Sequence, residues 1–491
     1  MVLLIVLFLA FLFYKETLFY YFISDDFLSF VKYKHFFDLV KINPDSNHYS
    51  PVVGVFNYFL HQIFLPNPFF YHLFSLSTHL INICLVYWLT RLFIKDKVKG
   101  IIACLIFAFF FANYEVVYWY GASNNLLLVT FYILSLIFLM KFVQTKKTVY
   151  SLIFQIAAVV AILTHEYAVS LIPVGLTYWF LFTKEKNLMK LIKIFLFPSV
   201  IFLLITILKF FLVKIPLLVR TSSLLKSTAF ILRSFVYLFI PNPYLIDKIP
   251  NFLIPIIFLE ILVFLFRFTK NKRTLFLLIW ASFTIFVYSV TSAPQARYFY
   301  LSSIPIIIYI LSVASVEIKS ADTYFRIFRE APSAEGEEGG SPFMRKYGIK
   351  LFLPKSNTIF YLLFILISGL VFLQNQKYYW QLSSEITKNV IKDMKKYQST
   401  IKKTDVLYFV NLPDSSNDSI WKAYVFRAGF KELLNNFVNI YPKEIVFLRS
   451  FTPTNHTIEA PYVSPNKLKT LAKENIVFVY KEDLKTVVLV K

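Results

Sequence analysis

The chain has 491 residues, of which 57% are hydrophobic and 19% aromatic, and its mean hydropathy is +0.62. This apolar content exceeds what a water-soluble fold of that length can bury, so we expect a multi-pass membrane protein. The formal net charge of +23 comes largely from basic connections between apolar segments, and it does not indicate nucleic-acid binding.

Eleven apolar runs predict membrane-spanning helices. A helix needs about 20 mostly apolar residues to cross the hydrocarbon layer, where it satisfies its own backbone hydrogen bonds. The runs cover about residues 1–22, 71–90, 100–118, 125–141, 149–164, 167–183, 194–213, 251–267, 274–290, 299–316 and 357–374. The predicted fold class is therefore mostly α, a polytopic membrane helical bundle of about 11 transmembrane helices.

Basic residues set the predicted orientation of this bundle. They gather in the even-numbered connections, for example between Lys95 and Lys99 and between Lys184 and Lys193. The stretch 113–125 and the turn around His165 contain no Lys or Arg. Because short cytoplasmic loops retain positive charge, we expect the short odd-numbered connections and the chain after residue 374 to lie outside the cytoplasm. The protein is expected in the plasma membrane.

The composition predicts two domains. Residues 1–374 form the membrane domain, with an outer loop at 23–70 and a linker at about 328–345 whose Gly, Glu and Pro content favours disorder. Hydropathy falls over residues 375–491, which we expect to form a small extracytoplasmic α/β domain. Its predicted elements are strands at 406–412, 444–448, 476–480 and 486–490 and a helix at 419–437.

Six ionisable groups fall at the outer edge of the predicted bundle, namely Asp25, Asp26, Glu115, His165, Glu166 and Arg297. The adjacent Asp25 and Asp26 directly follow the first span. A carboxylate there can remove a proton from a hydroxyl group, and its neighbour can orient it or hold a divalent cation. The alternative is the solvated start of a loop.

The other candidates are chemically complementary to this pair. Glu115 lies in an aromatic stretch, where an acid is costly to retain without a role. His165 and Glu166 occupy a tight turn, where they bind a charged headgroup or form a hydrogen-bonded cap. The Arg297 guanidinium matches phosphate oxygens, and Tyr298 can add a hydroxyl donor; otherwise the arginine extends toward the lipid surface.

Five short motifs carry a family resemblance. They are Ser24-Asp25-Asp26, Tyr71–Leu80, Glu115–Trp119, His165-Glu166 followed by Pro173, and Arg297–Leu301. In this order and spacing, over roughly residues 20–175 and 294–312, the chain resembles the GT-C superfamily of membrane glycosyltransferases. It is most similar to the branch related to the protein O-mannosyltransferases.

The resemblance implies an enzyme that transfers a hexose or pentose from a polyprenyl-phosphate donor to an acceptor outside the cytoplasm, with inversion. The acceptor is a protein, a lipid or a polysaccharide. Asp25 would accept the proton of the acceptor hydroxyl, and Asp26 would support it. Arg297 with Tyr298, and His165 with Glu166, would bind the donor phosphate and headgroup.

Glu115 would orient the sugar or a metal ion. The cofactor considered is a divalent cation, Mg²⁺ or Mn²⁺, with Asp26 and Glu115 as its candidate ligands. Two other classes of protein remain open from the residues alone. One is a non-catalytic membrane scaffold or glycan-binding relative, and the other is a transporter of lipid or polysaccharide.

Overall fold

The structure is a computed structural model that describes the chain except residues 33–34, 40, 42–48, 185–186, 213–223, 292–294, 330–341, 418, 451–459 and 491. Most of the predicted linker at about 328–345 therefore lies outside the described residues, as does part of the outer loop 23–70.

The first half of the described chain is helical. Its α-helices are α1 (Val2–Tyr14), α2 (Asp26–Lys32), α3 (Pro51–Phe64), α4 (Pro68–Ile94), α5 (Lys97–Ala108), α6 (Asn113–Tyr118), α7 (Ser123–Thr145), α8 (Thr148–Thr164), α9 (Leu171–Phe182) and α10 (Leu188–Leu212). Short helices of 3-10 type lie between them at η1 (Lys15–Phe19), η2 (Phe36–Leu39), η3 (Tyr120–Ala122) and η4 (Glu166–Ser170).

The second half adds helices and a small sheet. The helices are α11 (Leu224–Phe239), α12 (Pro243–Asp247), α13 (Ile254–Phe268), α14 (Lys272–Thr291), α15 (Ala296–Arg329), α16 (Pro342–Lys395), α17 (Phe430–Leu433), a π-helical turn η5 (Leu434–Val438) and α18 (Pro465–Glu474). The strands are β1 (Val406–Val410), β2 (Glu444–Leu448), β3 (Ile476–Lys481) and β4 (Thr486–Val490).

Six helical segments in the described residues are long and apolar enough to cross a bilayer. They are Val2–Phe19, Pro68–Ile94, Tyr120–Thr145, Leu188–Leu212, Ala296–Ala314 and Ile359–Lys395. The most apolar part of Ala296–Ala314 is 83% buried and that of Leu188–Leu212 only 22%, so α15 lies inside the bundle and α10 at its surface. The protein is thus mostly helical and suited to a membrane, and the count of about 11 spans stays a prediction.

The predicted span at 100–118 is two helices rather than one. α5 ends at Ala108 and α6 begins at Asn113, so the carbonyl groups at the end of α5 lose their partners within the helix. Asn113 supplies new ones, because its Nδ2 donates to Phe107 O at 2.5 Å and to Ala108 O at 3.0 Å. The Tyr14 hydroxyl also donates to Ala108 O, at 2.9 Å. This buried side-chain network turns the chain before Glu115.

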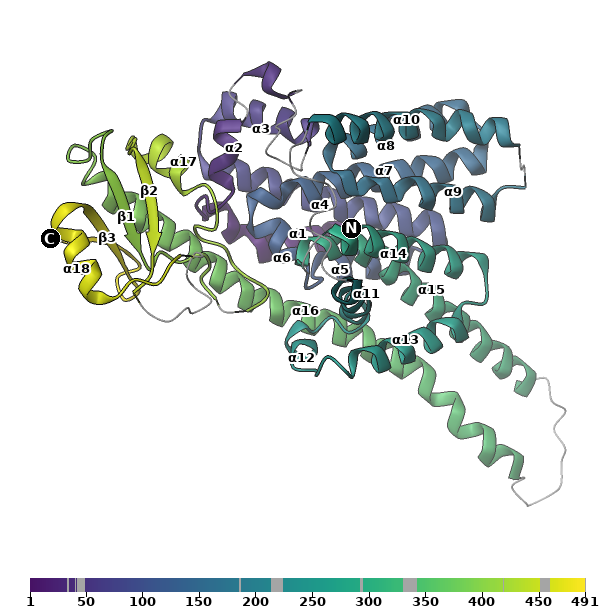
Figure 1. The fold of residues 1–491 in the computed structure, drawn as a ribbon. Coiled ribbons are helices and arrows are strands. Elements are labelled where there is room, and N and C mark those ends of the chain that lie inside the picture. Colours follow the sequence, from purple (N-terminus) through teal and green to yellow (C-terminus); the bar gives the residue numbers. More distant parts are fainter. Residues whose placement is uncertain are drawn as a thin grey trace.

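The four strands form one mixed sheet in the order β2-β1-β3-β4, in which β1 is parallel to β2 and β3, and β4 is antiparallel to β3. The sheet lies at one end of the helical bundle, where the C-terminal end of α16 reaches it (Figure 1). One face packs on α16 through Val390 and Met394, and the other packs on α18 through Leu468 and Leu471. All four predicted strands are confirmed.

The predicted helix at 419–437 is wrong over its first half. Residues 419–429 form a non-helical segment, and helix α17 begins only at Phe430. Gly429 precedes it with a φ of 76°, a left-handed conformation that interrupts a helix. The apolar pattern of this segment serves a different purpose, because Trp421 is buried against Phe111 and Tyr237 of the helical bundle.

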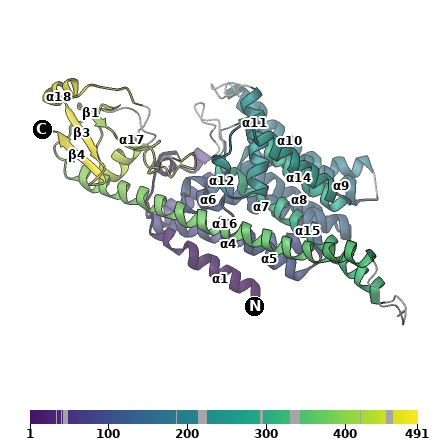
Figure 2. The same ribbon diagram turned by 90° about the horizontal axis from the view of Figure 1, so that it is seen from below.

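Helix α16 joins the bundle to the sheet as one continuous element, visible along the length of the molecule in Figure 2. The predicted boundary at residues 374 and 375 falls inside this helix. Phe22 and Tyr71 from the N-terminal part share a buried cluster with Phe409 and Phe478 of the sheet. The two parts of the chain are therefore packed against each other, and their division into domains stays a prediction.

Candidate functional site

Asp25 stands on a strained turn between η1 and α2. The preceding Ser24 has a φ of 47°, which is uncommon for a residue with a side chain. Within the turn, the Asp26 carboxylate accepts a hydrogen bond from Ile23 N at 2.9 Å. A second hydrogen bond ties the turn to the C-terminal part of the chain, where Ser24 N donates to Val425 O at 2.8 Å. The turn is thereby held in place from both sides, and Asp25 projects from it half-buried.

The two neighbouring aspartates have different environments. Asp26 is fully buried, whereas the Asp25 side chain reaches the surface and accepts a 3.4 Å contact from the Ser24 hydroxyl. Burial raises the pKa of Asp26 to about 8, although the hydrogen bond from Ile23 opposes the rise. Near neutral pH, Asp26 therefore carries a proton for most of the time, and its role in the turn is that of a hydrogen-bonded cap.

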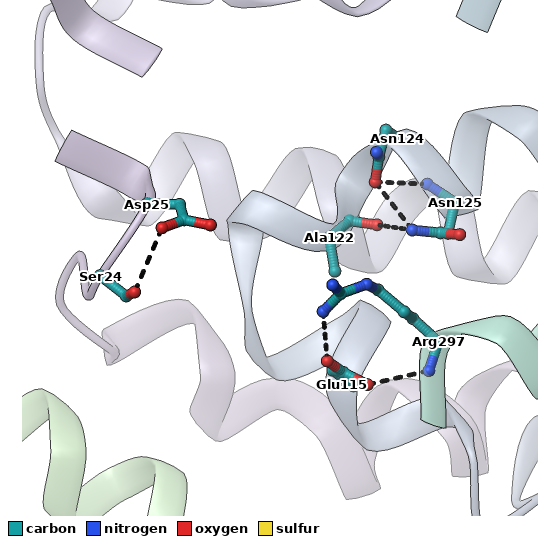
Figure 3. A network of polar contacts seen from close by, with 7 residues as sticks. All are labelled: Ser24, Asp25, Glu115, Ala122, Asn124, Asn125 and Arg297. Atoms are coloured by element: carbon teal, nitrogen blue, oxygen red, sulfur yellow. Dashed lines mark hydrogen bonds and ion pairs between the residues drawn. The ribbon is translucent and has the colours of Figure 1, made fainter. Parts of the chain in front are cut away.

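Glu115 and Arg297 form a buried ion pair with two points of contact. Arg297 Nη1 donates to Glu115 Oε1 at 2.5 Å, and the backbone N–H of Arg297 donates to Oε2 at 2.9 Å (Figure 3). That backbone group lies in the first turn of α15, where N–H groups lack partners within the helix. Glu115 thus caps α15 and neutralises its arginine at the same time. The side chains are 3% and 19% exposed for Glu115 and Arg297, respectively.

Aromatic rings hold the guanidinium of Arg297 in place. Its Cζ atom lies 5.2 Å from the centre of the Trp119 ring and 5.3 Å from that of Tyr298. Such cation–π contacts fix the orientation of an arginine without neutralising it. In Figure 3 the guanidinium lies next to the turn of Ala122, while the Asp25 carboxylate points toward the same side from the turn before α2.

The C-terminal part of the chain contributes Tyr424 to this site. Its ring lies 5.2 Å from that of Trp119. Burial raises the pKa of Tyr424 to about 12. The negative charges of Glu115 and Asp25 also raise this pKa, and the positive charges of Arg427 and Arg297 lower it. Charges affect a pKa in this way only when they are close. Asp25 and the Glu115–Arg297 pair therefore lie around one tyrosine.

Sequence reasoning missed Trp119 as a contact, and it missed Tyr424 and Arg427 altogether. The sequence predicts a helix of a separate domain for their segment. The one signal was its aromatic content, Trp421-Lys-Ala-Tyr-Val-Phe426, which is unusually apolar for a chain outside the membrane.

His165 and Glu166 lie at the turn between α8 and α9. The His165 Nδ1 accepts a hydrogen bond from Tyr167 N at 3.4 Å and lies 3.5 Å from Glu166 Oε2. The rings of His165 and Tyr167 stack at 4.3 Å, and the Tyr167 ring meets Tyr298 edge-on at 5.5 Å. His165 therefore reaches the Arg297 region through two aromatic rings.

The candidate metal ligands do not fit a cation. Both oxygens of Glu115 accept hydrogen bonds from Arg297, and one oxygen of Asp26 accepts a hydrogen bond from Ile23 N. Within the described ranges, no group of three or more His, Cys, Asp and Glu side chains is placed to hold a metal ion.

Residues 48–210 match the family model of the dolichyl-phosphate-mannose-protein mannosyltransferases. This range contains Glu115, Trp119, His165 and Glu166, and it confirms over its length the resemblance to the GT-C membrane glycosyltransferases. The match covers less than half of the chain, and it identifies neither a sugar nor an acceptor. No curated protein sequence matches the chain.

Several solved structures are similar at low identity. ArnT from Cupriavidus metallidurans, bound to undecaprenyl phosphate, is 13% identical with a TM-score of 0.48, and the match covers 98% of this chain and 93% of ArnT. The apo state of the same protein is 12% identical with a TM-score of 0.49, and the match covers 98% of this chain and 93% of ArnT. The Archaeoglobus fulgidus oligosaccharyltransferase, in complex with Zn and sulfate, is 13% identical with a TM-score of 0.46, over 94% of this chain and 62% of that one. At TM-scores below 0.5 these likenesses carry no functional argument.

Proposed function

We propose that this protein transfers a sugar from a polyprenyl-phosphate donor to an acceptor hydroxyl outside the cytoplasm, with inversion at the anomeric carbon. The observation that carries the proposal is that the Asp25 carboxylate and the Arg297 guanidinium, both partly exposed, lie on the same side of the site (Figure 3) and both act on the pKa of Tyr424. The first can take a proton and the second can face a phosphate. These are the two groups that such a transfer requires.

Asp25 is the base of the proposed reaction. Its carboxylate accepts the proton of the acceptor hydroxyl while that oxygen attacks the anomeric carbon and the bond from carbon to phosphate oxygen breaks. Asp26 is unsuited to this step, because it is fully buried and protonated near neutral pH. The strained turn at Ser24 fixes the direction of Asp25. Positioned proton transfer of this kind contributes about 10²- to 10⁴-fold in rate.

Arg297 stabilises the leaving phosphate. The polyprenyl phosphate gains negative charge as the sugar departs, and a guanidinium held in advance by Glu115 and Trp119 needs no reorganisation to meet it. Tyr298 lies beside the guanidinium. His165, stacked behind Tyr167, with Glu166 at its side, is placed to contact the sugar headgroup.

A transporter is a weaker account of the same residues. Charged groups that move a substrate through a bilayer lie near the midplane. Here Asp25, Glu115 and Arg297 are expected at one edge of the bundle rather than at its middle, and each lies in or just before the first turn of a helix.

The test is transfer from a synthetic polyprenyl-phosphate sugar by the purified full-length protein. A panel of hexose and pentose donors identifies the sugar, and mass spectrometry of cell-surface glycans from a deletion strain identifies the acceptor. Asp25→Asn should lower kcat by about 10²- to 10⁴-fold with little change in KM.

The matched control is Asp38→Asn, because Asp38 belongs to the same loop and its contacts, an ion pair with Lys41 at 2.8 Å and a hydrogen bond from His35 N at 2.9 Å, are at the surface. This control should keep wild-type turnover. Wild-type turnover in Asp25→Asn would remove Asp25 from the mechanism. A wild-type protein that transfers no sugar from any lipid-linked donor would reject the function.

A further inference from the structure

The ion pair of Glu115 and Arg297 provides no net positive charge for a phosphate. Arg297 is compensated by Glu115 at 2.5 Å, so the pair as a whole is neutral. A lipid phosphate carries at least one negative charge and gains another as the sugar leaves. On the proposed function, on which this inference rests, a site that binds and releases such a group needs a further cation.

Arg427 is the described cation that fits this requirement. Its Cζ atom lies 4.9 Å from the centre of the Tyr424 ring, and its side chain is exposed. Among the described residues, no carboxylate forms an ion pair with it, in contrast to Arg297. Tyr424 in turn packs on Trp119, which packs on Arg297. Two aromatic rings thus separate the guanidinium groups of Arg427 and Arg297.

The segment that carries Arg427 is fixed to the membrane bundle. Trp421 is 1% exposed, and its Nε1 donates to Asp247 Oδ2 at 2.8 Å. The same Asp247 accepts a hydrogen bond from the Tyr237 hydroxyl. Because Trp421 is anchored to α12 in this way, Arg427 is held at the site by buried contacts rather than by a free loop.

The same segment supports the turn of Asp25. Val425 O accepts the hydrogen bond from Ser24 N at 2.8 Å. A Cβ atom on Gly429 would lie 2.6 Å from Ser24 O and 3.2 Å from Phe27 Cβ, so the backbone at Gly429 packs directly on this turn. The segment Trp421–Gly429 therefore borders both the proposed base and the proposed phosphate site.

We propose that the segment Trp421–Gly429 completes the active site and that Arg427 adds a second cation to the site that binds the phosphate of the polyprenyl-linked donor. Arg427 supplies the positive charge that Glu115 removes from Arg297. Its stacking on Tyr424 sets the direction of the guanidinium, and its exposure leaves the N–H donors open to a ligand. The C-terminal part of the chain is then a component of the catalytic centre.

The experiment measures binding of undecaprenyl phosphate to the purified full-length protein in nanodiscs of zwitterionic lipid. Arg427→Gln should weaken binding by about 10- to 100-fold, the range for one lost charge-assisted hydrogen bond. Arg427→Lys should lose less, because it keeps the charge. Binding of uncharged undecaprenol should be equal in all variants. The control Lys469→Gln removes an exposed cation from α18, at the far face of the sheet, and should bind as the wild type does.

Each outcome decides between the two proposals. Undecaprenyl phosphate affinity in Arg427→Gln within twofold of the wild type overturns the role of Arg427 and leaves the transferase function standing. If Arg427→Gln loses binding to anionic phospholipid vesicles but not to undecaprenyl phosphate, Arg427 acts at the membrane surface. This result also overturns the proposed role of Arg427. A wild-type protein that binds no undecaprenyl phosphate rejects the proposed function and this inference with it.

Discussion

The buried pair of Glu115 and Arg297 allows a structural role to be separated from a catalytic one. Glu115→Gln keeps the shape of the side chain, and its amide oxygen can still accept the backbone N–H of Arg297. The substitution removes only the negative charge. Arg297 is then left 19% exposed with an uncompensated charge.

The expected magnitude follows from this burial. Removing one partner of a buried ion pair costs about 3–5 kcal/mol, mostly because the remaining charge stays desolvated. Arg297→Gln should also destabilise the fold, because Glu115 is then left without its buried partner. In the double variant Glu115→Gln/Arg297→Gln neither charge remains, so its loss of stability should be smaller than the sum of the two single losses.

The assay is unfolding of the purified protein in mixed micelles by titration with a denaturing detergent, followed by intrinsic tryptophan fluorescence. The matched control is Glu385→Gln, which breaks the pair with Lys485 at 2.9 Å, where both side chains are well exposed. An exposed pair of this kind contributes about 1 kcal/mol or less. Sugar transfer is measured on the same samples.

The double variant should recover stability without recovering transfer, because the phosphate has lost the guanidinium of Arg297. Additive losses, with the double variant equal to the sum of the singles, would refute the coupling of Glu115 and Arg297. Full transfer in the stable double variant would refute the role of Arg297 in catalysis.

Two further predictions concern the turn that carries Asp25. Asp26 has a pKa of about 8 in the folded state, whereas an unfolded aspartate ionises near pH 3.9. Between about pH 4 and 8 the unfolded state therefore binds fewer protons than the folded state. The free energy of unfolding of the wild type should fall across this range as the pH rises, by at most about 1.4 kcal/mol per pH unit. Asp26→Asn should remove this decline and keep transfer activity, and an unchanged pH dependence in unfolding titrations at pH 5 to 8 would contradict it. Gly429→Ala should lower kcat more than it changes KM, because its Cβ atom would displace Ser24. Gly429→Asn tolerates the positive φ but keeps the Cβ atom, so wild-type kinetics in that variant would show that contact with Ser24 does not matter.

Local chemistry made much of the protein predictable. The apolar runs predicted helices in the right places, because hydrocarbon-compatible segments have no other way to satisfy their backbone. The four short strands of the C-terminal part were predicted within two residues at each end, since they are short apolar runs rich in β-branched and aromatic residues. The order of the apolar runs also predicted that Glu115 and Arg297 lie at the same edge of the bundle.

Other features depended on contacts that the sequence does not encode locally. The break at Ala108 arises because Asn113 and Tyr14 satisfy the exposed carbonyl groups, and Tyr14 is distant in the chain. The helix predicted at 419–437 failed because its apolar side chains pack on the membrane bundle instead of on the sheet. Periodicity records that a residue is buried and not what buries it.

The sequence by itself determined a multi-pass membrane protein with acidic and basic groups at one edge, because hydropathy and the placement of charges are properties of short segments. Only the tertiary structure decided that Glu115 neutralises Arg297, that Asp26 is buried while Asp25 is accessible, and that Tyr424 and Arg427 arrive from the other end of the chain. These facts depend on which surfaces of distant segments come into contact, and that contact sets the burial and the electrostatic environment of each group.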